Sequence, residues 1–170
     1  RRPRPGRKEG SLVARIRSLA LINPGNPGSG RTRAALGAWR RILAAGDLTI
    51  LAWSMLPLVL GEKYLKDHQP VLEGMAQAIA ARNQPSALLA HLAAMADYPP
   101  LAGLVHATLP PTLFITGDDD PLSTPRAIQQ LAREHGHQHR NLPCVGHSLP
   151  IEAPRRCTEI LDTWLTGNAS

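Results

Sequence analysis

The sequence predicts an α/β protein with a parallel sheet of about three strands. Three short segments, 16–23, 112–116 and 137–142, are the candidate strands, and turn-forming residues follow each of them. Segments with helical spacing follow the second and third strands, at 125–135 and 154–165. Because alternation of strands with helices favours a parallel sheet, we expect the three strands to be parallel. Three strands are few for such a sheet, which suggests that part of a larger sheet is absent from these 170 residues.

The first predicted strand, 16–23, is short and apolar and ends in Asn-Pro-Gly. The loop after it, 23–30, contains glycines and prolines that exclude a regular element. From residue 31 to residue 96 the apolar spacing is helical throughout. We therefore expect an all-helical insertion between the first and second strands.

Four helical stretches are expected within this insertion. The first, 31–45, gathers its large apolar residues on one face. Asp47 can cap a second, very apolar helix, which we expect Pro57 to interrupt. Two stretches rich in Ala and Leu follow at 62–83 and 86–96, with prolines that mark helix starts.

After residue 111 the pattern changes to short alternating elements. The second strand, 112–116, is β-branched and aromatic, and Pro125 suits the first position of the helix predicted over 125–135. The third strand, 137–142, is a weaker prediction because it is mostly polar. The closing helix, 154–165, is amphipathic.

The net positive charge is concentrated at the start of the chain. The sequence has 19 Lys and Arg against 13 Asp and Glu, a net charge of +6. Residues 1–17 hold seven of the basic residues and a single acid, Glu9, which accounts for the whole excess. We expect residues 1–11 to be a basic, disordered leader, because they lack apolar periodicity. This leader could instead bind phosphate groups non-specifically. Nucleic acid is not the expected partner, because the rest of the chain has no net charge.

The cysteines and the apolar segments indicate where in the cell the protein is expected. Cys144 and Cys157 are the only two cysteines and lack CxxC spacing, which favours a cytoplasmic protein with reduced thiols. The apolar stretch 48–60 is too short to span a bilayer and contains a proline. No membrane association is expected.

Two loops that follow predicted strands carry the residues of chemical interest. A Gly-Asp-Asp-Asp-Pro run begins at Gly117, directly after the second strand, and Gly146-His147 comes shortly after the third. The carboxyl ends of parallel strands meet at one edge of a sheet, so Asp120 and His147 can lie side by side. There the carboxylate can fix the tautomer of the imidazole, and the imidazole can act as a general base.

Each of these residues also has a purely structural interpretation. Asp120 could form a turn or cap a helix, and His147 could cap backbone carbonyls in its loop. Asp118 and Asp119 are expected to be solvated turn residues. Glu152 is expected to favour the first turn of the last helix through its charge.

Two places in the sequence have residue types that can bind a metal ion. The histidines at 135, 137 and 139 lack a Cys or carboxylate at metal-site spacing, and the three acids at 118–120 lack the other oxygen ligands of a calcium loop. No metal or organic cofactor is expected.

Over about residues 12 to 166 the chain resembles the C-terminal portion of the α/β-hydrolase fold family. The family's acid follows a strand in a Gly-x-x-Asp-Pro motif, and its histidine lies in a Gly-His loop before a Glu-x-Pro helix start, here Glu152-Ala-Pro154. The resemblance implies that Asp120 and His147 are the catalytic pair of a partial α/β-hydrolase sheet with a helical lid. It also implies a division into a basic leader at 1–11, a core strand and loop at 12–30, a helical lid (cap) at 31–100, and a C-terminal core segment with the acid and the histidine at 101–170.

The chain departs from the family in one respect that concerns the nucleophile. The family has a G-x-S-x-G nucleophile elbow between a strand and a helix, and this string does not occur here. The nearest string is centred on Ser54, where bulky neighbours and helical spacing disfavour the sharp turn. We expect the nucleophile and oxyanion hole to belong to an absent N-terminal part, and the chain alone to be inactive.

The resemblance implies a hydrolase with a Ser-His-Asp mechanism. Its substrate would be a small, largely apolar carbonyl compound with an ester, lactone or amide bond. A missing N-terminal half or a second copy of the chain could be a partner. Two alternatives stay open: a non-enzymatic, degenerate hydrolase scaffold or interaction protein, and a miniature hydrolase that uses Ser54.

Overall fold

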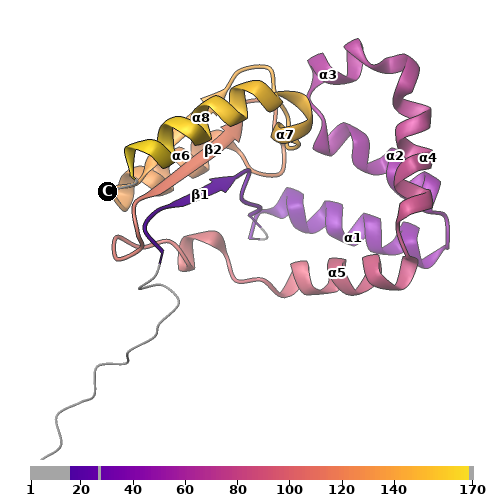
Figure 1. Ribbon diagram of the computed structural model, residues 1–170. Coiled ribbons are helices and arrows are strands. Elements are labelled where there is room, and N and C mark those ends of the chain that lie inside the picture. The colour runs from indigo at the N-terminus through magenta and orange to yellow at the C-terminus, as the bar shows by residue number, and fades with distance from the viewer. Residues whose placement is uncertain (1–15, 27, 169–170) are drawn as a thin grey trace, which may run out of the picture.

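The computed structural model describes residues 16–26 and 28–168 of the chain. The expectation of a disordered leader at 1–11 falls outside these residues. Three strands form one sheet: β1 (Leu19–Ile22), β2 (Thr112–Gly117) and β3 (Gln138–Leu142). They run parallel in the order β1-β2-β3, which confirms the predicted α/β class and the small parallel sheet. Figure 1 shows β1 beside β2.

The two faces of the sheet are covered by different helices. On one face Leu113 and Ile115 pack with Trp164 of α8 (Pro154–Gly167). On the other face Phe114 packs with Ile128 of α6 (Pro125–Glu134). Successive residues of a strand point to opposite faces, so β2 is buried along its whole length between these two layers.

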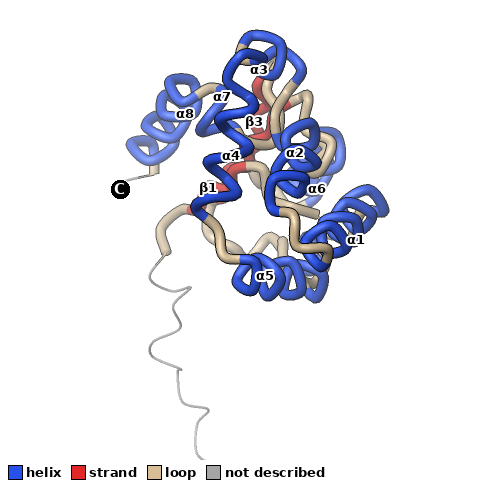
Figure 2. The backbone as a smooth tube through the Cα atoms, turned by 90° about the vertical axis from the view of Figure 1, so that its right-hand side faces the viewer, coloured by secondary structure: helices blue, strands red, loops and turns tan. Residues whose placement is uncertain are grey.

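The five helices between β1 and β2 pack on one another beyond the carboxyl ends of the strands (Figures 1 and 2). Leu36 and Trp39 of α1 form an apolar cluster with Leu51 of α2 and Leu92 of α5. A second cluster joins α2 to α4 through Leu56 and Ala76 among others. The helices are α1 (Gly30–Ala44), α2 (Leu48–Val59), α3 (Glu62–Asp67), α4 (Leu72–Arg82) and α5 (Pro85–Asp97), with a 3-10 turn, η2, at Gln69–Val71.

Three details of the helical prediction were wrong. Pro57 does not interrupt α2, which continues to Val59, although a proline cannot donate the usual hydrogen bond to the Trp53 carbonyl. Both residues are exposed. The stretch 62–83 is divided into α3, η2 and α4. Two short elements, η3 (Leu101–Gly103) and α7 (Leu149–Glu152), were not expected.

The helical segment is tied to the sheet region by few polar contacts. Thr32 of α1 donates its hydroxyl to the Leu122 carbonyl, and the Ser148 N–H donates to the Val59 carbonyl over 2.9 Å. Within residues 16–26 and 28–168, none of the helices combines the length and apolar character needed to cross a membrane.

Candidate active site

Asp120 and His147 lie at the carboxyl edge of the sheet, in the loops that follow β2 and β3. The Oδ2 atom of Asp120 is 2.8 Å from Nδ1 of His147. The side chain of Asp120 is fully buried, whereas that of His147 is 27% exposed. The structure therefore brings the two predicted residues into direct contact.

The second carboxylate oxygen of Asp120 holds the local backbone. Oδ1 accepts hydrogen bonds from the N–H groups of Leu122 (2.7 Å) and Ser123 (2.9 Å). Asp120 thus forms the turn that the structural interpretation suggested and also contacts the imidazole. Because the turn fixes the carboxylate plane, Oδ2 is presented to His147 in one orientation.

The contact with Asp120 defines what the imidazole can do. An ionised carboxylate only accepts hydrogen bonds, so Nδ1 of His147 carries a proton and donates it. In the neutral ring the lone pair then lies on Nε2. Nε2 has no hydrogen-bond partner among the described residues. A partly exposed basic nitrogen of this kind can accept a proton from an approaching group.

Asn23, directly after β1, joins both loops and was not predicted. Its side-chain N–H groups donate to the carbonyls of Gly146 (3.0 Å) and His147, and its Oδ1 accepts from the Gly117 N–H over 3.2 Å. It is only 6% exposed and has a φ of +41°, a conformation that Asn tolerates better than most residues. The only signal in the sequence was an Asn at a strand end before Pro-Gly, which indicates a turn and no more.

Glu152 has a different role from the one expected. It ends the short helix α7, and its carboxylate turns back to accept three backbone N–H groups. Oε2 accepts from Gly61 (2.8 Å) and Gly146 (2.9 Å), and Oε1 accepts from Ser148 (3.1 Å). The carboxylate therefore joins the His147 loop to the segment between α2 and α3.

The loops at this edge approach one another as backbone. A Cβ atom at Gly117 would lie 2.1 Å from the carbonyl oxygen of Val145, and one at Gly146 would lie 2.3 Å from the backbone N of Gly61. These distances leave no room for a side chain. The glycines of both predicted motifs are therefore required by close packing around Asp120 and His147.

Asp118 and Asp119 are exposed, as expected of turn residues. Asp119 does more than was predicted, because its Oδ2 accepts the Glu62 N–H at the start of α3. The prediction for Asp119 missed this contact because its partner lies 57 positions away in the sequence.

Ser54 lies inside α2, and its hydroxyl donates to the Leu51 carbonyl over 2.7 Å. It is not on a strand-to-helix turn, so the geometry of a nucleophile elbow is absent at this position. Ser123 is buried and donates its hydroxyl to the Pro24 carbonyl. Neither hydroxyl is directed to His147.

The histidines at 135–139 do not converge. Nε2 of His139 is 2.8 Å from the Thr116 hydroxyl, and Nε2 of His137 is 3.2 Å from the His106 carbonyl oxygen. Burial, and to a lesser degree the nearby Arg140 charge, lower the pKa of His139. No group of three or more His, Cys, Asp or Glu side chains able to hold a metal ion occurs in the part of the chain that the structure describes.

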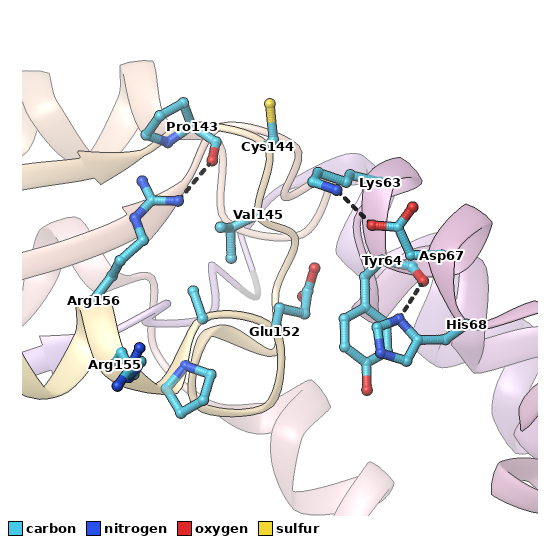
Figure 3. Close-up of a pocket in the computed structure, with 12 residues that line it drawn as sticks. Lys63, Tyr64, Asp67, His68, Pro143, Cys144, Val145, Glu152, Arg155 and Arg156 are labelled. Carbon is cyan, nitrogen blue, oxygen red and sulfur yellow. Dashed lines mark hydrogen bonds and ion pairs between the residues drawn. The ribbon is translucent and has the colours of Figure 1, made fainter.

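A cavity of about 640 Å³ lies between α3 and the start of α8 (Figure 3). Its lining includes Lys63, Tyr64, Cys144 and Glu152 but neither Asp120 nor His147. The cavity is therefore separate from the Asp120–His147 pair and is not assigned as its substrate pocket.

Comparison with known proteins shows similarity to the alpha/beta hydrolase family. A sequence profile described as the Alpha/beta hydrolase family matches residues 7–160. Two curated relatives, the abhydrolase domain-containing proteins ACTT2-1 and ACTT2-2 of Alternaria alternata, are each 30% identical over 90 residues. That match covers 45% of this chain and 33% of each relative.

Solved structures agree over most of the chain. A thermophilic esterase from Thermogutta terrifontis has a TM-score of 0.77 and 26% identity, covering 92% of this chain and 58% of the esterase. The enol-lactonase from Burkholderia xenovorans has a TM-score of 0.71 and 21% identity, covering 91% of this chain and 58% of the lactonase. The chain thus spans about a third of its curated relatives and somewhat more than half of these two enzymes.

Proposed function

This chain belongs to the alpha/beta hydrolase family, and from that premise we propose that it supplies the acid and the base of a serine hydrolase. In this proposal Asp120 orients the imidazole and His147 is the general base. The observation that carries the proposal is the 2.8 Å contact between Asp120 Oδ2 and His147 Nδ1, with Nε2 left unpartnered among the described residues.

The proposed reaction proceeds in two stages. Nε2 of His147 takes the proton of a serine hydroxyl as its oxygen attacks the substrate carbonyl. The imidazolium then gives that proton to the leaving group, and an acyl-enzyme remains. In the second stage His147 takes a proton from a water molecule whose oxygen attacks the acyl carbon. The acyl–serine bond breaks, the acid product leaves, and the imidazolium returns its proton to the serine oxygen. Asp120 stabilises the imidazolium in both stages.

The proposed nucleophile lies in a segment other than the 170 residues of this chain. Two facts support this proposal: Ser54 and Ser123 donate to backbone carbonyls, and the chain covers only 58% of the esterase that it resembles. We propose that the additional segment packs against the edge of β1 that has no partner strand among the described residues, and that it also provides the oxyanion hole.

The proposed substrate is a small, largely apolar ester, lactone or amide. The similarity to an esterase and to an enol-lactonase supports the first two bond types. We propose that residues 31–100, which include α1–α5, act as a lid over the substrate, because they lie beyond the strand ends that carry Asp120 and His147. The core would comprise residues 12–30 and 101–170.

A cytoplasmic location is also proposed. Cys144 and Cys157 are not joined by a disulfide bond, and burial raises the pKa of the Cys157 thiol. An unreactive buried thiol and an exposed free thiol suit a reducing compartment.

The test uses the complete protein that contains this chain and a nucleophile segment. We expect it to hydrolyse 4-nitrophenyl butyrate, and His147→Ala to reduce turnover by about 10⁴ or more. A fluorophosphonate probe should label the complete protein and should leave the isolated 170 residues unlabelled. Failure of the complete protein to cleave any ester, lactone or amide would show that the assignment is wrong, and labelling of the isolated chain that Ser54→Ala abolishes would favour Ser54 instead.

A further inference from the structure

Glu152 links the lid to the loop that carries the base. We infer that Glu152 is a positioning residue that holds the first turn of α3 and the His147 loop as one unit, so that displacement of the lid changes the orientation of the imidazole. The functional part of this inference rests on the proposed roles of His147 and the lid. The physical linkage itself can be tested without any enzymatic activity.

The hydrogen bonds of Glu152 suit a carboxylate and no other side chain. Two N–H groups, from Gly61 of the lid and Gly146 of the His147 loop, converge on the single atom Oε2. A third N–H, from Ser148, meets Oε1. A glutamine would present an NH₂ group to at least one of these donors, so at least one hydrogen bond would be lost in either orientation of the amide.

The two segments are in contact as backbone as well as through Glu152. The Ser148 N–H donates to the Val59 carbonyl over 2.9 Å. A Cβ atom on Gly61 would lie 2.8 Å from the backbone N of Gly146 and 3.0 Å from Glu152 Oε2. With so little free space, the lid segment cannot shift toward the loop without moving it.

Helix α3 depends on these contacts for its position. It has six residues, none of them buried, and its N-cap residue, Gly61, has no side chain to cap it. The first N–H groups are met instead by acids of the core: Gly61 by Glu152, and Glu62 by Asp119, the neighbour of Asp120. Tyr64 and Leu65 pack α3 against α2 and α4, so it is the polar contacts that set the position of α3 relative to the two site loops.

Figure 3 shows Glu152 between the loop of Cys144 and Val145 and the helix that carries Lys63 and Tyr64. The cavity of about 640 Å³ opens at the same place. The junction is therefore held by these few polar and backbone contacts, with open space beside them. Loss of the carboxylate contacts should loosen the lid and the His147 loop together.

The first experiment measures amide hydrogen exchange on the full 170-residue chain. In Glu152→Gln we expect the Gly61 and Gly146 amides to exchange about ten- to a hundredfold faster, because a neutral amide oxygen in the place of Oε2 weakens both hydrogen bonds and an NH₂ group there removes them. Glu159→Gln removes the same charge from an exposed position on α8 and should leave both rates unchanged. Faster exchange at Gly146 with no change at Gly61 would overturn the inference, since Glu152 would then support its own loop only.

The second experiment perturbs the lid and observes the base. Gly61→Ala should shift the ¹⁵N resonances of the His147 imidazole, although residue 61 has no contact with that ring. Gly74→Ala is the matched control, because a Cβ atom on this lid glycine meets nothing within 4 Å. Identical His147 spectra in Gly61→Ala and wild type would contradict the inference. This test does not need Glu152→Gln, so it applies even if that variant fails to fold.

These readouts separate the linkage from the proposed function. If both experiments give the expected result and the complete protein cleaves no ester, the linkage stands and the hydrolase assignment fails. If the complete protein is an active hydrolase but the Gly61→Ala spectra are unchanged, the function stands and the linkage is wrong.

Discussion

Asp120 uses its two carboxylate oxygens for different partners. Oδ1 holds the turn through Leu122 and Ser123, and Oδ2 holds His147. Replacement by asparagine separates these tasks, because the amide oxygen can keep the turn while the NH₂ group faces Nδ1. The ring would then carry its proton on Nε2, the nitrogen that must act as the base.

We therefore expect Asp120→Asn to preserve the fold and to lower turnover of the complete protein by about 10⁴. Steady-state hydrolysis of 4-nitrophenyl butyrate gives the rate, and ¹⁵N spectra of the imidazole give the tautomer. Asp118→Asn is the control, since Asp118 is exposed and its carboxylate has no hydrogen bond or ion pair among the described residues. Wild-type turnover in Asp120→Asn would mean that the wrong acid has been chosen.

Asn23 contributes both hydrogen bonds and a backbone conformation. We expect Asn23→Gly to lower the free energy of unfolding by about 1–3 kcal/mol, because buried partners in the Gly117 and Gly146 loops lose their bonds. Asn23→Ala should cost about 1 kcal/mol more, because alanine also resists a φ of +41°. Urea unfolding of the 170-residue chain measures both values, and equal stability of the two variants would exclude the backbone contribution.

The contacts of individual residues could be predicted only where the local sequence determines them. Asp120 and His147 could be identified because each follows a strand in a short glycine-containing motif. Asn23 and Glu152 could not, because their partners are backbone groups up to 124 and 91 positions away and carry no side-chain signature. The proposed catalytic roles of Asp120 and His147 remain predictions.

At the scale of elements, sequence pattern worked best for long or strongly apolar segments. β2 was predicted from its β-branched and aromatic run, and its alternating residues pack on α8 and α6 as a buried parallel strand should. α7 was missed because four residues with a proline near the start are too short for helical periodicity. β3 was a weak prediction because its outward residues are polar and mostly exposed.

The pairing of β2 with β3 involves a titratable side chain, that of His139. Thr116 of β2 lies within hydrogen-bond distance of His139 and Asn141 of β3. Burial lowers the pKa of His139 below 6.5, so the unfolded chain binds a proton there before the folded chain does. Stability is therefore present above pH 6.5 and is lost as the pH falls from 6.5 toward the lower pKa of the folded state.

We expect the free energy of unfolding to be smaller at pH 5.5 than at pH 7.5, and His139→Gln to reduce this difference. Urea titrations at the two pH values provide the measurement. His91→Gln is the control, because His91 is exposed on α5. A pH dependence that His139→Gln leaves unaltered would show that another group is responsible.

At the scale of the whole molecule, the sequence indicated the order of parts but not how they join. The helical insertion and the two core segments follow from hydrophobic spacing. Among the contacts that join the helical segment to the sheet region, those of Gly61 and Glu62 run from backbone N–H groups to Glu152 and Asp119. Hydrophobic pattern contains no information on such polar, long-range contacts.

The burial of β1 leads to a prediction about the complete protein. β1 is only half-buried along its length, whereas β2 is wholly buried, and among the described residues β1 pairs on one side only. A segment that adds a strand to this edge should raise Tm by about 5 °C or more, since covering apolar side chains contributes about 1–3 kcal/mol each and 1 kcal/mol corresponds to about 2–4 °C. Calorimetry of the complete protein and of the 170-residue chain, at equal concentration, measures the difference.

Leu21→Thr should lower Tm more in the complete protein than in the isolated chain. Leu165→Thr, at an exposed position on α8, should lower the Tm of neither protein. An equal effect of Leu21→Thr in both proteins would show that the added segment packs elsewhere and that β1 is a true edge of the sheet.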